Sequence, residues 1–147
     1  MINPPDALNT LQSKPLNTIF LLLAGVSGLM SVAIAAADNH LLPDALAPGG
    51  QVLIDQAILF QLTHAICLLA LFFTFPSAPT ALKATLRLSA AGFAVGLLLF
   101  CLPIYWLAFH GPESLGPFSL LTPIGGTGFL IGWAGLSWAG LRYAATN

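Results

Sequence analysis

The chain alternates between long apolar stretches and short polar connections. Four stretches are apolar enough and long enough to form membrane helices: Leu16–Ala37, Ile54–Phe75, Ala84–Phe109 and Pro123–Leu141. An α-helix rises about 1.5 Å per residue, so roughly 20 residues cross a hydrocarbon core of about 30 Å. Because each stretch is about that long, the pattern predicts four transmembrane helices.

Composition separates this protein from soluble domains. Of its 147 residues, 57% are hydrophobic and 6% are charged, whereas about a quarter of the residues of a soluble domain are charged. We predict an all-α fold, an integral membrane bundle of four transmembrane helices over residues 16–142, with a short N-terminal segment 1–15 and a tail 143–147. The segments outside the helices are too short to hold a core of their own.

Charge divides the connections into two groups. The four basic residues lie in the N-terminal segment, around the start of the third helix and at the C-terminus: Lys14, Lys83, Arg87 and Arg142. The other two connections contain no lysine or arginine. Their ionisable residues are Asp38, His40, Asp44, Asp55, His110 and Glu113. Lysine and arginine are enriched in cytoplasmic loops, so we expect both termini in the cytoplasm. The net charge of −1 gives no reason to expect nucleic-acid binding.

A cleaved secretory signal is an alternative for the first stretch. Lys14 precedes the apolar run, and the small residues of "AIAAADNH" (33–40) resemble a cleavage site. However, the run of about 20 apolar residues exceeds the 7–15 of a typical signal core, so a membrane helix is favoured.

Small residues recur four positions apart on three of the predicted helices. The pairs are Ala24 and Gly28, Gly92 and Gly96, and Gly128 and Gly132. Such pairs let helix backbones approach closely in lipid, so we expect them at helix contacts. Thr122 followed by Pro123 is typical of a helix cap and first helical residue. Pro103 predicts a kink in the third helix, because proline removes a backbone hydrogen bond.

The second helix carries polar residues at the level of the membrane interior. Gln61 and His64 are three apart and share a helix face. Ionisable groups at that depth are costly and usually point into the bundle. One hypothesis is that His64 forms part of a site for a quinone headgroup or a proton, or that it is one axial ligand of a haem. The other, which we favour, is a neutral imidazole that bonds Gln61 or a serine of a neighbouring helix.

The remaining histidines offer a weaker hypothesis of a metal site. His40 and His110 lie at the outer ends of two predicted helices, and Glu113 follows closely. Imidazole and carboxylate ligands suit zinc or copper, but these residues lack a diagnostic spacing, so solvated loop residues are favoured. A haem would require a second histidine at the depth of His64, and there is none. We therefore expect no metal and no cofactor.

Four separated stretches resemble one known family. They are "GVSGLMSVAIAAADNH" (25–40), "FQLTHAI" (60–66), "FCLPIYWL" (100–107) and "LTPIGGTGFLIGW" (121–133). They resemble the YgdD-like family of small bacterial inner-membrane proteins, catalogued as domain of unknown function 423. The resemblance implies a four-helix fold in a bacterial inner membrane, and it implies no established activity.

The matches and departures within that pattern define a candidate site. Ser27, His40, His64 and Tyr105 match the family pattern, whereas Phe60 stands where relatives tend to have tyrosine. "AAADNH" replaces a glycine-rich "GAFGAH", and Leu102-Pro103 replaces a Gly-Ser pair. The candidate site, for a ligand or for interhelical polar contact, comprises Gln61, His64, Ser27 and Tyr105.

With so little chain outside the membrane, a catalytic centre is hard to build. We therefore expect a non-catalytic accessory or assembly subunit, embedded in the lipid bilayer, that docks onto a larger membrane complex such as a respiratory or redox enzyme, or that forms a homo-oligomer. The alternative is a small binding protein for a quinone, lipid or metal that uses His64 and Gln61, or His40 with His110 and Glu113. Transport is less favoured, because no helix carries several buried charges.

Overall fold

The computed structural model describes residues 4–38 and 42–145, and for residues 4–17, 38 and 43 it describes the backbone alone. The helical elements in chain order are α1 (Pro4–Asp38), η1 (Pro43–Ala45), α2 (Gly50–Thr74), α3 (Thr80–Gly96), η2 (Leu97–Cys101), α4 (Leu102–His110), η3 (Pro112–Leu120) and α5 (Leu121–Ala144). Four helical segments are long and apolar enough to cross a membrane: Thr18–Ala37, Gly50–Thr74, Thr80–His110 and Pro112–Ala144. The predicted all-α fold with four membrane helices is confirmed.

The first helix is longer than the sequence predicted. It begins at Pro4 rather than Leu16, so most of the segment predicted to precede the bundle is helical. Pro4 and Pro5 lie in its first turn, where a missing N–H costs no hydrogen bond. Residues 7–14 include alanine, leucine, glutamine and lysine, which favour helix, so the single bond lost at Pro15 does not end it.

Pro103 is accommodated in the third membrane segment by a change of helix type. α3, η2 and α4 follow one another with helical backbone angles, and η2 is a π-helical turn that ends two residues before the proline. Proline cannot donate to the carbonyl four residues earlier and its ring crowds that carbonyl. A π-helical turn is one of the known ways in which a helix absorbs such a disruption.

The predicted cap of the fourth membrane helix is wrong. α5 begins at Leu121, and Leu120 precedes it as the cap residue without a side-chain hydrogen bond, so Thr122 and Pro123 lie inside the first turn. The physical reason is the 3-10 helix η3, from which the Phe118 carbonyl accepts the Leu121 N–H. That carbonyl replaces the side-chain cap, and the Thr122 hydroxyl is buried without a partner.

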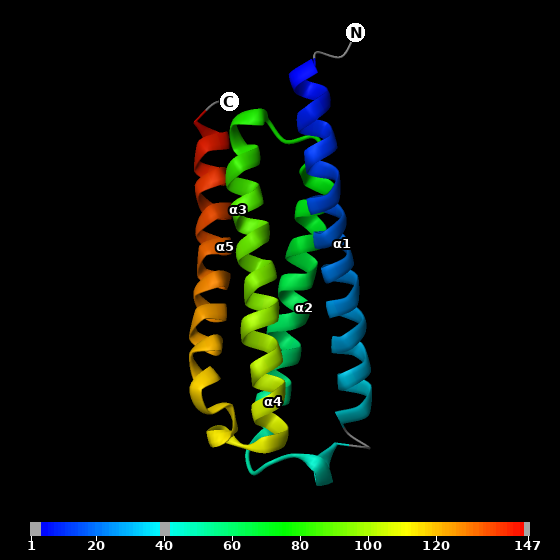
Figure 1. Ribbon diagram of the computed structural model, residues 1–147, viewed down its shortest axis with the longest axis vertical. Coiled ribbons are helices and arrows are strands. Elements are labelled where there is room, and N and C mark those ends of the chain that lie inside the picture. Colours follow the sequence, from blue (N-terminus) through cyan, green and yellow to red (C-terminus); the bar gives the residue numbers. More distant parts are fainter. Residues whose placement is uncertain (1–3, 39–41, 146–147) are drawn as a thin grey trace.

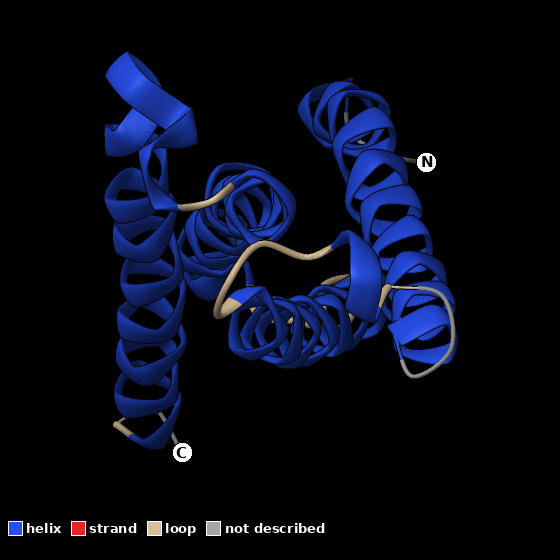
Figure 2. Ribbon diagram, turned by 90° about the horizontal axis from the view of Figure 1, so that it is seen from below, coloured by secondary structure: helices blue, strands red, loops and turns tan. Residues whose placement is uncertain are grey.

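The helices form an open bundle. Figure 1 shows both described ends of the chain at one end of the bundle, together with the α2–α3 turn. The α1–α2 and α4–α5 connections lie at the opposite end. Seen along the bundle, α1 and α5 lie on opposite sides of the α2 and α3–α4 helices (Figure 2). α1 packs mainly on α2, and α5 packs mainly on α3 and η2.

The two groups of charges lie at opposite ends of this bundle. Lys83 and Arg87 lie in the first turns of α3 and Arg142 in the last turn of α5, at the end that carries the termini. Asp44 and Glu113 lie in the connections at the other end (Figure 1). The fold therefore places Lys83, Arg87 and Arg142 at one end of the bundle and Asp44 and Glu113 at the other.

The α3 and α5 helices pack closely along one seam. A Cβ built on Gly92 would lie 2.6 Å from the Gly128 carbonyl oxygen and 2.9 Å from the Gly132 nitrogen, so backbone meets backbone there. A Cβ on Gly96 would overlap the ring of Phe129. All four glycines that the sequence paired on these two helices thus lie in one contact, where a larger residue has no room.

The pair on α1 is placed differently. Ala24 is buried, but a Cβ on Gly28 would meet nothing within 4 Å. The close contact expected at Gly28 is therefore not found among the described residues, and Leu62, Ala65 and Ile66 of α2 line the same open space. Gly28 lines an open groove instead.

Candidate functional site

The buried face of α2 carries the polar residues that the sequence singled out. Its buried positions follow a spacing of three and four residues: Ile54, Ala57, Gln61, His64, Leu68 and Leu71. That spacing is one helix face. Gln61 and His64 therefore point into the bundle as expected, and both are nearly inaccessible, with exposures of 3% and 4%.

Gln61 pairs with Tyr105 across the α2–α4 contact. The Tyr105 hydroxyl donates to the Gln61 side-chain oxygen at 2.6 Å, and both side chains are buried. The sequence placed both residues in one site without pairing them. A buried hydroxyl or amide in an apolar interior must find such a partner, since leaving it unpaired is costly.

His64 pairs with a residue that the sequence analysis did not anticipate. The indole N–H of Trp133 on α5 donates to His64 Nε2 at 3.1 Å, and His64 Nδ1 lies 2.7 Å from the Phe60 carbonyl oxygen on its own helix. Indole is a donor only, so Nε2 must be the acceptor and Nδ1 must carry the proton. The two bonds together require a neutral imidazole.

Aromatic rings surround this imidazole. It stacks on Phe129 of α5 with ring centroids 3.7 Å apart and planes 16° apart. Phe93 of α3 lies 5.3 Å from it, and Phe60 5.8 Å. We call Phe60, His64, Phe93, Phe129 and Trp133 the aromatic cluster. It joins α2, α3 and α5, and the same Phe93 ring fills the space beside Gly132.

The geometry favours packing over ligand binding at His64. A haem iron or another metal needs a free imidazole nitrogen, and both nitrogens are engaged. The interpretation of His64 as a neutral, buried polar contact therefore has structural support, with a changed partner. Gln61 is not that partner, since it bonds Tyr105, and neither is a serine.

Trp133 could have been found from the sequence by one rule. It lies near the middle of α5, where lipid offers no acceptor for its indole N–H. A tryptophan at that depth needs a polar partner on a facing helix. Residue His64, near the middle of α2, is the acceptor that meets this need.

Ser27 is buried on α1 and stands apart from the other candidate residues. Its backbone carbonyl accepts the Ser31 hydroxyl at 2.9 Å. Among the described residues, no hydrogen bond joins Ser27 to Gln61, His64 or Tyr105. The four candidates thus separate into three groups: the Gln61–Tyr105 pair, His64 in the aromatic cluster, and Ser27 on α1.

The hypothesis of a metal site at the acidic end stays untested. His40 lies outside the described residues. His110 stacks on Trp106 at 3.9 Å and its Nδ1 lies 3.0 Å from the Trp106 carbonyl oxygen, while Glu113 is exposed. Within the described part of the chain, no group of three or more metal-ligating side chains occurs.

Comparison with known proteins identifies the family. The family described as "Protein of unknown function (DUF423)" matches residues 33–126, which include all of α2 and the α3–α4 helix. A UPF0382 membrane protein of Haemophilus influenzae is 35% identical over 125 residues, covering 84% of this chain and 94% of the relative. The chain belongs to the DUF423 family.

Further relatives of the DUF423 family agree with this placement. A UPF0382 membrane protein of Staphylococcus epidermidis is 30% identical over 128 residues, which cover 86% of this chain and 98% of that protein. The UPF0382 inner membrane protein YgdD of Escherichia coli is 28% identical over 118 residues, which cover 78% of this chain and 82% of that protein. No solved structure gave a significant match. The resemblance stated from the sequence is confirmed: this is a membrane protein of a family of unknown function.

Proposed function

We propose that this DUF423 member is a non-catalytic accessory or assembly subunit of a larger membrane complex, and that the groove between α1 and α2 receives a transmembrane helix of its partner. The supporting observation is that small residues line this groove and that, among the described residues, only α1 and α2 contribute to its lining. Gly25 and Gly28 line it on α1, opposite Leu62 and Ile66 on α2. Its volume is about 180 Å³.

The exposure of α1 supports a partner on this side. In an apolar stretch of 18 residues within α1, 17% of the residues are buried, against 50% in a stretch of the same length within Thr80–His110. Its outer face is apolar, with Leu22, Val26 and Leu29 all more than half exposed. Lipid can cover such a face, but a groove floored by glycines also lets another helix backbone approach closely.

The enclosed polar groups support a role without catalysis. Tyr105 and Gln61 satisfy each other, and His64 is held between Trp133 and Phe60. These groups join the helices through hydrogen bonds and ring contacts inside the bundle. For that reason we do not extend the proposal to a quinone or metal bound at His64.

The location completes the proposal. We place the protein in a bacterial inner membrane, as the name of the YgdD relative indicates for that protein. The end that carries Lys83, Arg87 and Arg142 faces the cytoplasm with both termini, because basic residues are retained on that side. The acidic end then faces outward.

Site-specific cross-linking tests this proposal. A photo-crosslinking amino acid at position 28 and, separately, at position 140 of the tagged protein is activated in native membranes, and the products are purified and identified. Both positions have open space beside the backbone, but Gly140 lies on α5, away from the groove. We expect a stoichiometric adduct with a subunit of a larger membrane complex at position 28 alone, and Gly28→Leu should abolish recovery of that complex in mild detergent.

Two other results would contradict the accessory role. An adduct between two copies of this chain would make the groove a homo-oligomer contact. Recovery of the protein alone, with lipid adducts only at both positions, would leave no partner for the groove.

A further inference from the structure

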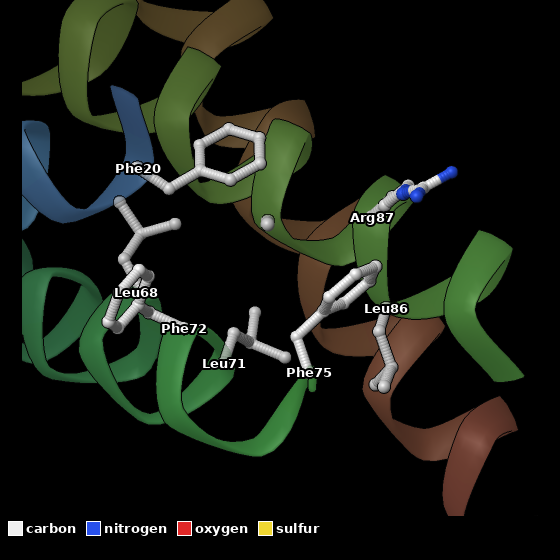
Figure 3. Close-up of a pocket in the computed structure, with 8 residues that line it drawn as sticks. Phe20, Leu68, Leu71, Phe72, Phe75, Leu86 and Arg87 are labelled. Carbon is white, nitrogen blue, oxygen red and sulfur yellow. The ribbon is translucent and has the colours of Figure 1, made fainter. Parts of the chain in front are cut away.

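A second apolar pocket lies where α1, α2 and α3 meet, toward the end that carries the termini. Figure 3 shows Phe20 of α1, Leu68 of α2, Phe75 directly after α2, and Leu86 of α3 around it. The lining is apolar apart from Arg87, which lies at the rim with its guanidinium directed outward (Figure 3). The groove of the proposed function does not include these residues.

Two cations share one aromatic ring at this rim. The guanidinium carbon of Arg87 lies 5.1 Å from the centroid of the Phe75 ring, and Lys83 Nζ lies 5.7 Å from it. Lys83 and Arg87 are one helical turn apart on α3, so both can reach one ligand beside that ring. In the described part of the chain, neither forms a salt bridge with an acidic side chain.

Lys83 and Arg87 lie in the first turns of the third membrane segment, near one end of the hydrocarbon core. The segment Thr80–His110 has 31 residues and spans about 46 Å, so it extends beyond a hydrocarbon core of about 30 Å at both ends. Lys83 and Arg87 follow Thr80 by about 5 Å and about 10 Å along the axis. Long basic side chains at such positions extend toward the phosphate layer.

The start of α3 adds to the attraction for an anion. Its cap residue Pro79 makes no side-chain hydrogen bond to the first turn. The N–H groups of a first turn and the positive end of the helix dipole favour a negative group nearby. Lys83, Arg87 and this helix end therefore place positive charge near the same membrane surface.

We propose that this pocket binds an anionic phospholipid, with the phosphate against Lys83 and Arg87 and an acyl chain along the apolar lining. Basic pockets between membrane helices are a recognised type of lipid site. The free volume of about 10 Å³ leaves no room for a compact soluble ligand. An acyl chain needs no enclosed volume, because it lies along the crevice and continues into the bilayer.

Lipid titration of the full-length protein tests the site. Delipidated protein in mild detergent is titrated with dioleoylphosphatidylglycerol or dioleoylphosphatidylcholine, and bound lipid is counted by native mass spectrometry. The anionic lipid should bind more tightly. Each of Lys83→Gln and Arg87→Gln should weaken its binding about five-fold, the change that about 1 kcal/mol per basic residue gives. Arg87→Lys, which keeps the charge, should retain most of the affinity.

Arg142→Gln is the matched control, since it removes one positive charge from the same end of the bundle but from α5, which does not line the pocket. Circular dichroism verifies that each variant is folded. If Arg87→Gln does not fold, Lys83→Gln still tests the site. Equal affinity for the two lipids would overturn the proposal. So would equal weakening by Arg142→Gln, or displacement of the lipid by millimolar inorganic phosphate.

Discussion

Two surfaces of this protein carry small residues four positions apart and use them in opposite ways. On α3 and α5, Gly92 and Gly128 face each other and the backbones touch. On α1, Gly25 and Gly28 have open space beside them and line a groove together with residues of α2. The spacing alone predicts a face that permits close approach. Whether a helix of the same chain makes that approach depends on the residues opposite.

The α3–α5 seam should be the most sensitive contact in the molecule. We expect Gly92→Leu to destabilise the isolated bundle by about 3 kcal/mol or more, because its Cβ meets backbone atoms that cannot rotate away. Thermal unfolding in mild detergent, followed by circular dichroism, measures the effect. Gly140→Leu adds the same side chain to open space on α5 and is the control. Equal midpoints for the two variants would show that the seam is not packed as described.

The aromatic cluster should be the next most sensitive. His64→Leu removes the acceptor of the Trp133 indole and the ring stacked on Phe129, so we expect a loss of about 1–2 kcal/mol. A double-mutant cycle with Trp133→Phe isolates the hydrogen bond, because the second substitution removes its donor. Denaturant unfolding of the four proteins provides the energies. Strictly additive losses would mean that the two side chains do not interact.

The Gln61–Tyr105 pair should contribute less. Tyr105→Phe removes a single hydroxyl and keeps the ring, so we expect a loss of about 0.6 kcal/mol, the average for polar contacts between membrane helices. The same denaturant series measures it. Gln61→Leu in the Tyr105→Phe background should then cost little more through polar effects. A large further loss would point to a second partner of Gln61.

The sequence predicted the fold more fully than the site. Four apolar stretches of about 20 residues leave few alternatives to a helical membrane bundle, since only helices or closed barrels span lipid. The helix ends were less certain, because tertiary context set them. Thr122 has the residue type of a cap, yet the carbonyl of Phe118 in the preceding 3-10 helix occupies that role.

The hydrogen-bond partners of the buried polar residues could not be predicted from the sequence, because they depend on how the helices face one another. His64 and Trp133 are 69 positions apart, and Gln61 and Tyr105 are 44 apart. The pattern showed that Gln61 and His64 point inward but not which helix each one meets. For the same reason, Gly28 was expected in a close contact, whereas it lines an open groove.

The open groove should show the smallest effect on stability and the largest on assembly. Gly28→Leu places a side chain in free space, so we expect the free energy of unfolding of the isolated protein to change by no more than about 0.5 kcal/mol. If a partner helix occupies the groove, the same substitution removes the space for its backbone and should abolish co-purification. Thermal unfolding and recovery of the complex, measured on one preparation, separate these effects. A loss of stability as large as that of Gly92→Leu would mean that the groove closes within the chain itself, and the contrast between the two surfaces would be wrong.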